Sequence, residues 1–369
     1  MWWLIIPVTI YSAVILALWS ILRRIKIPGL PSGENKTRIS VVVPCHNEEK
    51  NIERLISCLS KQNYPLENYE VIITDDNSSD NTVALIQEAI SSLPPGSADI
   101  RLIHNQGSGK KSALRAGISE SRGELILTTD ADCRVGPRWI SAFVSCFEKT
   151  GADMILGSVA MLSSGTPVSG FAVAEFSALQ GITEATAFFG FPVMSNGANM
   201  GFRKSVYLSH SSSLHDEVPS GDDMFLLHSV RHAGGRIKFI GCGAAAAETA
   251  AAVSVAALLR QRARWASRTS LYRDTPTLTL AAATAACNAA AAAAAVASLF
   301  SVHLLLLTAI LYSIRLIPDY LISRYPIKKR KGHLPFLSFL IMELIYPFYF
   351  LLVAALSLLP SMRNYSSRD

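Results

Sequence analysis

Several features that would mark a soluble, disulfide-built or zinc-built protein are scarce in this sequence. Only 17% of the 369 residues are charged, whereas a soluble globular domain has roughly a quarter. The six cysteines form no Cys-x-x-Cys pair and no Cys/His cluster with zinc spacing, which indicates small core residues in a reducing compartment. The net charge of +6 comes without a dense basic face, so nucleic-acid binding is not predicted. The composition is therefore best explained by association with a membrane.

Long uncharged runs predict where the chain enters a membrane. Residues 1–22 carry no charge and would form a helix of roughly 33 Å, enough for a hydrocarbon core of roughly 30 Å. Arg23, Arg24 and Lys26 follow this run, which is the reverse of the order in a signal peptide. We therefore expect a retained anchor over residues 1–26 whose basic end is cytoplasmic.

A second uncharged run covers residues 275–314 and predicts a helical hairpin over 275–317. Its first arm is rich in alanine, which suits close helix packing in lipid, although a poorly spanning low-complexity segment is the alternative. We expect a basic cytoplasmic loop over 318–333 and a final span over 334–360. Glu343 interrupts that span, and we expect it to face the helix bundle or lie near an interface.

Residues 38–259 have the composition of a soluble α/β domain. Runs rich in β-branched residues predict four strands, and each is followed by a segment of helical character. The strands are expected at 39–43, 69–74, 100–104 and 124–129, and the helices at 48–61, 80–91, 110–121 and 137–149. This alternation predicts a mainly parallel sheet with helices on both faces, and ligands bind such sheets at the carboxyl ends of the strands.

Acidic and polar residues follow three of these strands. They are His46 and Glu48, with Pro44, after the first, Asp75 and Asp76 after the second, and Asp130 and Asp132 after the fourth. Crowded carboxylates repel one another unless a cation or the hydrogen-bond donors of a ligand lie between them. An Asp-x-Asp sequence at a strand end suits Mg²⁺ or Mn²⁺ that also binds diphosphate oxygens. For Asp75 and Asp76, helix capping and turn formation are the alternative explanation.

Two later segments add further candidates. Asp222 and Asp223 open an amphipathic helix, where the helix dipole alone would favour acidic residues. Gln261, Arg264 and Trp265 form the pattern Gln-x-x-Arg-Trp on a short helix just before the hairpin. An interfacial Arg/Trp anchor is the alternative explanation for that pattern.

Taken in order, these motifs closely resemble the membrane-embedded members of glycosyltransferase family 2, whose catalytic unit has the GT-A fold. The resemblance covers nearly the whole chain and includes Gly-Lys-Lys-Ser-Ala-Leu at 109–114 and Ser-Asn-Gly-Ala-Asn-Met-Gly-Phe-Arg at 195–203. It implies a Rossmann-like GT-A domain over 38–259 and an interfacial helix over 260–274. Many relatives have Glu-Asp where this chain has Asp222-Asp223, which leaves the choice of base slightly open.

The resemblance also implies roles for the candidate residues. The nucleotide-sugar site would contain Pro44, His46, Glu48, Asp75, Asp76, Lys110 and Asp130. Asp130 and Asp132 would hold Mg²⁺ or Mn²⁺, while Asp223, beside Asp222, would be the base. Gln261, Arg264 and Trp265 would contact the diphosphate and the acceptor.

The reaction implied is inverting transfer from a nucleotide sugar, with a UDP-sugar favoured, to a lipid or lipid-linked acceptor. It would take place at the cytoplasmic face of a bacterial cytoplasmic membrane and serve cell-envelope glycolipid or polysaccharide synthesis. A processive polysaccharide synthase is one alternative, because Gln-x-x-Arg-Trp is typical of those enzymes as well as of ceramide glucosyltransferases. A homo-oligomer and an export partner are left open.

Two functions of other classes were compared with this one. A non-catalytic membrane scaffold with a degenerate transferase domain would be expected to lose acidic residues that this chain keeps. An ATPase is not predicted from residues 107–112, because a P-loop needs Gly five residues before the Gly-Lys pair and Ser or Thr directly after the Lys. His104 and Lys111 occupy those positions here.

Overall fold

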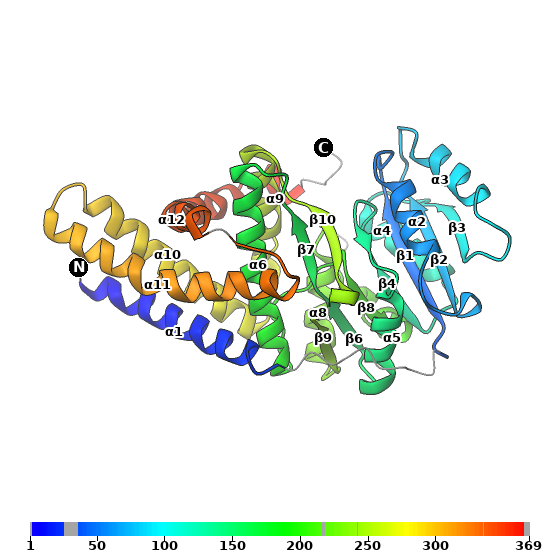
Figure 1. The fold of residues 1–369 in the computed structure, drawn as a ribbon, viewed down its shortest axis with the longest axis horizontal. Helices are drawn as coiled ribbons and strands as arrows, with labels where there is room; N and C mark the ends of the chain where they lie inside the picture. Colours follow the sequence, from blue (N-terminus) through cyan, green and yellow to red (C-terminus); the bar gives the residue numbers. More distant parts are fainter. Residues whose placement is uncertain (1, 26–35, 216–217, 242, 335, 365–369) are drawn as a thin grey trace. The chain divides into compact units, whose positions relative to one another are not determined.

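Figure 1 shows the computed structural model, which describes residues 2–25, 36–215, 218–241, 243–334 and 336–364. Residues 1 and 26 of the predicted anchor, Cys242 among the six cysteines, and residue 335 of the predicted final span lie outside the described residues. The chain divides into two compact units, which we call the sheet unit and the helical unit. The sheet unit contains Ile27–Ala160 and Met194–Ala250, and the helical unit contains Met1–Lys26, Met161–Val193 and Ala251–Asn364.

The sheet unit is built on seven strands in the order β3-β2-β1-β4-β8-β6-β9. β1 is parallel to β2 and β4, β2 to β3, and β6 to β9, whereas β8 is antiparallel to β4 and β6. The mainly parallel α/β sheet is thus confirmed. The strands are β1 (Ile39–Cys45), β2 (Tyr69–Asp75), β3 (Asp99–His104), β4 (Leu125–Thr128), β6 (Met154–Gly157), β8 (Met200–Arg203) and β9 (Ile237–Ile240).

Helices cover both faces of the sheet. Val41 and Val43 of β1 belong to an apolar core with residues of α2 and α5, while Val42 points to the opposite face. There α4 packs so closely that a Cβ on Gly117 would lie 2.4 Å from a methyl group of Val42. The helices of the sheet unit are α2 (Ile52–Ser60), α3 (Thr82–Ser91), α4 (Lys110–Glu120), α5 (Trp139–Thr150), α7 (Lys204–His210) and α8 (Asp222–His232). Every residue of β1 and β2 is buried, as expected for parallel strands covered on both sides.

A smaller sheet has the order β5-β10-β7. Its strands are β5 (Arg134–Val135), β7 (Val159–Leu162) and β10 (Ala247–Ala250). These strands were not predicted from the sequence. Thr249 of β10 contacts Asp132 of the candidate site.

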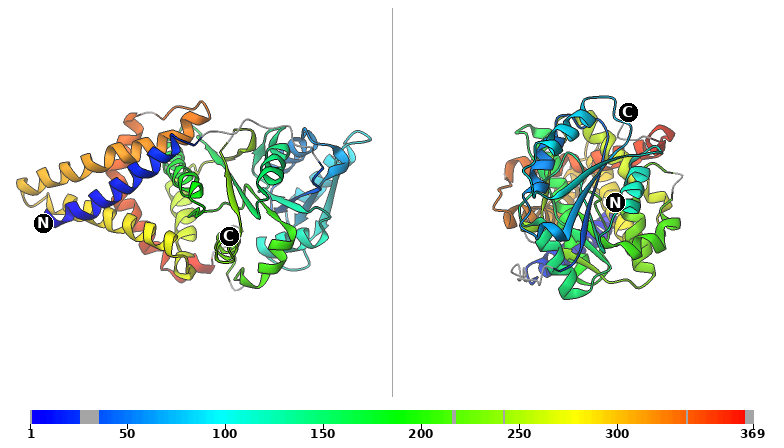
Figure 2. Two further views of the ribbon diagram at one scale, coloured as in Figure 1. Left: turned by 90° about the horizontal axis from the view of Figure 1, so that it is seen from below. Right: turned by 90° about the vertical axis from the view of Figure 1, so that its right-hand side faces the viewer.

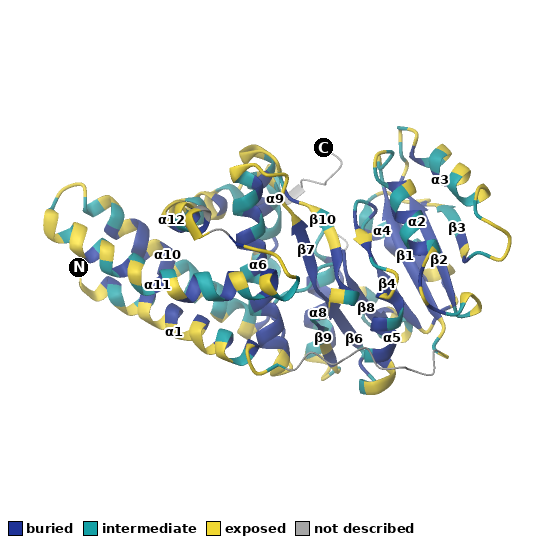
Figure 3. Ribbon diagram, in the orientation of Figure 1, coloured by how far each residue is buried: buried dark blue, intermediate teal, exposed yellow. Residues whose placement is uncertain are grey.

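The helical unit consists mainly of helices, several of them long. Its helices are α1 (Ile5–Leu22), α6 (Pro167–Phe188), α9 (Val255–Ala266), α10 (Thr275–Ala297), α11 (Val302–Lys329), α12 (Phe336–Ser357) and the short α13 (Pro360–Asn364). Four helices of the described chain are long and apolar enough to cross a membrane: α1, α10, α11 and α12. Many positions on these helices are exposed, as Figure 3 shows in yellow. Large apolar residues are among them, for example Ile10, Leu305 and Leu344, and lipid would cover this surface.

α1 and α11 lie side by side (Figure 2), and α1 contacts its neighbours along one seam. The buried apolar residues from Leu4, just before α1, to Leu22 recur at alternating spacings of four and three, which places them on one helix face. They are Leu4, Val8, Tyr11, Ile15, Leu18 and Leu22. The anchor predicted over residues 1–26 is therefore a helix packed into a bundle rather than an isolated one.

A buried polar network joins the four helices α1, α10, α11 and α12. Arg315 of α11 forms ion pairs with Asp319 and with Glu343 of α12. Its Nη1 also donates to Oδ1 of Asn288 on α10 at 3.2 Å, and Tyr11 Oη of α1 donates to Asp319 Oδ1 at 2.8 Å. Glu343 is 2% exposed and faces the helix bundle, which confirms the first of its two expected positions.

Three expected segments need correction. Residues 318–329 belong to α11 and are helical, so the basic loop expected over 318–333 is confined to the residues after Lys329. The interfacial helix expected over 260–274 begins earlier, as α9 covers Val255–Ala266. The 22-residue α6, inside the range assigned to the GT-A domain, belongs to the helical unit.

Candidate active site

The strands β1, β2 and β3 end together at one edge of the sheet. Their register places Cys45 beside Asp75 and Asp75 beside His104. β4 pairs with β1 up to Thr128, so the residues after β4 emerge at the same edge. The polar segments that follow these strands therefore meet there, as the sequence predicts.

The two acidic residues after β2 hold the loops of this edge. Asp76 Oδ1 accepts hydrogen bonds from Asn105 Nδ2 at 2.7 Å and from the backbone N–H of Gly109 at 3.1 Å. His46 Nδ1 lies 2.8 Å from the carbonyl oxygen of Asp76. Asp75 accepts from the N–H of Ser78 with both carboxylate oxygens. The turn-forming role that sequence offered as an alternative is thus present for Asp75, whereas Asp76 bonds to distant segments and positions the start of α4.

Lys110, the first residue of α4, lies among the acidic side chains. Its Nζ is 2.5 Å from Asp130 Oδ1. Burial lowers the pKa of Lys110, but the carboxylates of Asp130, Asp222 and Asp223 outweigh burial and raise it above its usual range. The ammonium therefore stays charged at every physiological pH. Acidic residues that follow β4 and that begin α8 thus interact electrostatically with this one cation.

Asp132 is held in place from three sides. Thr249 Oγ1 of β10 donates to Asp132 Oδ2 at 2.8 Å, and Cys133 Sγ lies 3.5 Å from Oδ1. Arg54 Nη2 donates to the backbone oxygen of Asp132 at 3.0 Å, which ties α2 to this loop. Burial and the nearby Asp130 carboxylate raise the pKa of Asp132, as expected for two like charges in one place.

The pKa of Glu48 is affected by the same two carboxylates. Burial raises the pKa of Glu48, a hydrogen bond from Asn51 opposes that shift, and the carboxylates of Asp132 and Asp130 add to it. Residues far apart in sequence are thus close enough to interact electrostatically. The predicted gathering of acidic side chains at this edge is present within the sheet unit.

Asp223, at the start of α8, accepts two backbone hydrogen bonds. Gly197 N–H donates to Oδ2 at 3.0 Å and Met224 N–H donates to Oδ1 at 2.8 Å. Thr128 at the end of β4 fixes this loop, because its hydroxyl donates to the Gly197 oxygen at 2.8 Å. Burial and the Asp222 carboxylate raise the pKa of Asp223 to about 6. A carboxylate with that pKa can accept a proton near neutral pH.

The donor set at Asp130 and Asp132 fits a divalent cation that the substrate helps to bind. Within the described residues, no three His, Cys, Asp or Glu side chains stand close enough to hold a metal by themselves. Mg²⁺, however, is usually bound by one or two carboxylates together with substrate phosphates. The mutual repulsion expressed in the raised pKa of Asp132 is the kind that a divalent cation relieves.

The Gln-x-x-Arg-Trp residues lie on α9 in the helical unit. The central feature there is Arg262, one of the two residues that the pattern leaves unspecified, which is 4% exposed. It donates to Glu175 Oε2 of α6 at 2.9 Å and to Gln261 Oε1 at 2.5 Å. Its guanidinium also stacks over the ring of Trp265, 4.3 Å from the centroid. Arg264 is half-buried. The approach of Gln261, Arg264 and Trp265 to a nucleotide sugar stays a prediction.

Sequence reasoning missed several residues that support the site. Thr249 and Arg54 lie in no recognised motif, and Arg262 fills an unspecified position of Gln-x-x-Arg-Trp. Their partners lie 117, 78 and 87 positions away in sequence. Gly197 lies inside a motif that was recognised, but nothing in the motif connects it with Asp223.

Family models match most of the chain. The model described as glycosyl transferase family group 2 matches residues 125–359, which is more than half of the chain. A second model, glycosyl transferase family 2, matches residues 40–207.

Similar curated proteins match about a third of this chain. The glycosyltransferase AglE of Haloferax volcanii is 31% identical over 121 residues, which is 33% of this chain and 39% of that protein. An undecaprenyl-phosphate 4-deoxy-4-formamido-L-arabinose transferase of Proteus mirabilis is 35% identical over 123 residues, 33% of this chain and 37% of that protein. The chain thus spans about two fifths of the length of these relatives.

One solved structure is similar over almost its whole length. It is the mannosyltransferase PcManGT from Pyrobaculum calidifontis in complex with GDP-Man and Mn²⁺, with a TM-score of 0.62 and 20% identity. The match covers 89% of this chain and 98% of that chain. The likeness confirms the GT-A fold with its mainly parallel sheet.

Proposed function

This chain belongs to glycosyl transferase family group 2, and from that membership we propose that it transfers a sugar from a nucleotide sugar to a lipid-linked acceptor. The observation that carries the proposal is the gathering of Asp130, Asp222 and Asp223 around Lys110 at the carboxyl edge of the sheet. A nucleoside diphosphate needs cations and a sugar acceptor needs a base, and this edge offers residues of both kinds.

The nucleotide sugar would bind at the ends of β1, β2 and β4. Pro44, His46, Glu48, Asp75 and Asp76 line or support that edge, and Asp76 also fixes the loop before Lys110. Lys110 would turn from Asp130 toward the diphosphate, because its raised pKa keeps it cationic. A UDP-sugar is our preferred donor.

Asp130 and Asp132 would hold Mg²⁺ or Mn²⁺. When bound, the metal would neutralise charge on the departing nucleoside diphosphate. Within the protein, Thr249 and Arg54 would keep Asp132 oriented toward that position. The mannosyltransferase with the similar fold was solved with Mn²⁺ and GDP-Man, which supports a donor and metal of this kind.

Asp223 would accept the proton from the acceptor hydroxyl as it attacks the sugar. Its pKa of about 6 leaves it deprotonated at neutral pH yet basic enough to take a proton. The two backbone N–H groups that bind its oxygens fix the carboxylate in one orientation. Attack on the face opposite the leaving group would invert the anomeric centre. Asp222, buried beside it, would act through its charge.

The acceptor would reach the enzyme from the lipid. Four helices could cross a membrane, and one relative is named for transfer to undecaprenyl phosphate. We place the helical unit in a bacterial cytoplasmic membrane with the sheet unit on the cytoplasmic side. Gln261, Arg264 and Trp265 would contact the diphosphate and the acceptor, and Arg262 would position Gln261 and Trp265 by its contacts with both.

The test is label transfer in membranes that contain the protein. Membranes are incubated with a panel of radiolabelled UDP- and GDP-sugars, and the products are separated into lipid and polymer fractions. We expect label from one donor in the lipid fraction, absent from matched membranes that contain Asp223→Asn.

Two other results would each overturn part of the proposal. Label in a high-molecular-weight polymer would show that the protein is a processive synthase and does not transfer a single sugar. No label from any donor, with folded protein present, would favour a non-catalytic scaffold.

A further inference from the structure

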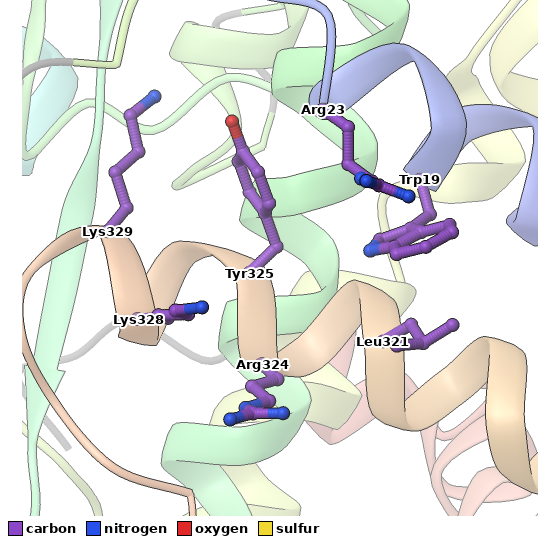
Figure 4. Close-up of a pocket in the computed structure, with 7 residues that line it drawn as sticks. All are labelled: Trp19, Arg23, Leu321, Arg324, Tyr325, Lys328 and Lys329. Carbon is purple, nitrogen blue, oxygen red and sulfur yellow. The ribbon is translucent and has the colours of Figure 1, made fainter.

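A cavity lies within the helical unit, between the C-terminal ends of α1 and α11 (Figure 4). Its volume is about 460 Å³, inside the range of roughly 300–1,000 Å³ found for small-molecule sites. α1 contributes Trp19 and Arg23 to the wall, and the last turns of α11 contribute the rest. These residues take no part in the candidate active site.

The wall of this cavity is basic. Arg23, Arg324, Lys328 and Lys329 supply four cations. Glu184 of α6 pairs with one of them, with its Oε1 2.5 Å from Lys329 Nζ. Across the described residues, no carboxylate lies within ion-pair distance of the other three. A multiply charged anion would complement them.

Contacts between the helices form the cavity in advance of any ligand. Tyr325 Oη donates to the backbone oxygen of Leu22 at 2.7 Å, which ties α11 to the end of α1. The Arg23 guanidinium lies over the Trp19 indole, 5.0 Å from the ring centroid. Arg324 is likewise stacked over a ring, that of Tyr320, at 5.7 Å. Two of the cations are therefore partly positioned by aromatic side chains.

Each helix changes from apolar to basic along the face that leads into the cavity. Residues three or four positions apart share a helix face. On α11 this face carries Ile314, Ile317, Leu321, Arg324 and Lys328, and on α1 it carries Leu16, Trp19 and Arg23. Ile317 is 62% and Leu16 38% exposed. An amphiphile with an apolar chain and an anionic head matches this order.

We infer that this cavity binds the phosphate headgroup of an anionic membrane lipid, whose chain lies along the apolar part of the same face. Basic pockets between membrane helices on the cytoplasmic side bind such headgroups in general. The inference rests on the proposed placement of the helical unit in a membrane and does not depend on the proposed sugar transfer. Free phosphate has the same head chemistry but no chain, so the two sources differ in affinity.

The test compares two double variants of the full chain purified in a neutral detergent. Arg324→Gln with Lys328→Gln removes two cations from the cavity, and Arg24→Gln with Lys331→Gln removes two exposed cations that do not line it. Equilibrium binding of radiolabelled phosphatidic acid in mixed micelles is measured without any nucleotide sugar. Phosphatidylcholine and inorganic phosphate serve as competitors.

We expect the cavity variant to bind phosphatidic acid about thirtyfold more weakly than the wild type, because each basic residue near a lipid phosphate contributes roughly a factor of five. The outer variant should bind like the wild type. Arg23→Gln alone, on the opposite wall, should lose about fivefold. Unlabelled phosphatidic acid should compete, and inorganic phosphate at equal concentration should not.

Three results would overturn the inference. Equal losses in the cavity and outer variants would assign binding to overall charge. Inorganic phosphate competing as well as phosphatidic acid would assign the cavity to a soluble anion. If the wild type bound phosphatidic acid and phosphatidylcholine equally well, the cavity would not be a site for an anionic headgroup. Thermal unfolding of each variant, expected to match the wild type, excludes misfolding as the cause of a loss.

Discussion

In the sheet unit, Lys110 pairs with Asp130 at an accessible edge and also interacts electrostatically with Asp222 and Asp223, whereas in the helical unit the charges of Arg315, Asp319 and Glu343 are buried inside a helix bundle. The side chains of Lys110 and Asp130 are 40% and 31% exposed, but those of Arg315 and Glu343 are 1% and 2% exposed. Excess negative charge that a substrate can reach is suited to binding and catalysis. Charges that no substrate can reach hold helices together.

This contrast predicts that mutations in the two regions reduce different measured properties. Replacing an acid of the sheet unit should reduce turnover and leave the fold intact. Replacing a member of the buried network should reduce stability.

The largest effect is expected for Asp223→Asn. Loss of the general base should reduce the initial rate of sugar transfer about 10²- to 10⁴-fold, while thermal unfolding stays unchanged. The exposed Glu67→Gln, far from the site in the 3-10 helix Leu66–Asn68, is the control for removing one negative charge. Near-normal turnover by Asp223→Asn would remove it from the role of base.

Asp222→Asn decides between the two neighbouring acids in the same assay. If Asp223 is the base, Asp222→Asn should lose less activity than Asp223→Asn. The reverse order would transfer the role to Asp222.

The buried network is tested by Arg315→Met. The change leaves the carboxylates of Asp319 and Glu343 buried without their cation, which should cost about 3–5 kcal/mol of stability. Thermal unfolding in detergent measures this loss. Arg324→Met on the same helix is the control, because Arg324 is exposed and its replacement should change stability by less than about 0.5 kcal/mol. Equal shifts for both variants would contradict a structural role for the network.

A smaller effect is expected from pH. Asp223 has a pKa of about 6, and only its deprotonated form accepts a proton, so kcat/KM should be constant above that pH and fall about tenfold per unit below it. Burial and the neighbouring Arg231 and His232 lower the pKa of His228 on the same helix to about 4, so His228 does not produce this change.

Histidines in general titrate between pH 5 and 8, so His46→Gln is the control for the pH profile. The fall below pH 6 should persist in that variant even if its rate is lower. A profile that becomes flat in His46→Gln would assign the titration to His46.

The smallest effect concerns a helix cap in the helical unit. Ser254 accepts a hydrogen bond from the N–H of Ala257 at the start of α9, so Ser254→Ala should cost about 0.5–2 kcal/mol. The control Ser298→Ala removes a hydroxyl that donates to Ala295 O at 2.7 Å one turn earlier and should cost less. Differential scanning calorimetry compares the two melting temperatures, and equal values would contradict the capping role.

Local sequence patterns predicted the part of the fold that depends on local preference. β1 to β4 and the helices between them were found from β-branched runs followed by helical segments, and their observed bounds differ from the predicted ones by a few residues at most. The acidic edge followed from them, because parallel strands place their ends together.

Other features depend on long-range contacts that a single sequence does not display. The contact of Thr249 with Asp132 and that of Arg262 with Glu175 arise only when distant segments meet. The segment expected to be a loop after residue 317 is helical although it contains two prolines. Pro318, Ile322 and Pro326 are buried at a spacing of four, so packing of one helix face stabilises it.

The central claim is that the acidic edge of the sheet unit holds a divalent cation together with a nucleoside diphosphate. The most direct test is electron paramagnetic resonance of Mn²⁺ titrated into the full chain in the presence of UDP. Wild-type protein should bind one Mn²⁺ per chain, and Asp132→Asn should bind at least about tenfold more weakly, since even losing a residue that only orients a ligand costs that much. Equal Mn²⁺ affinity in the wild type and Asp132→Asn would contradict the account.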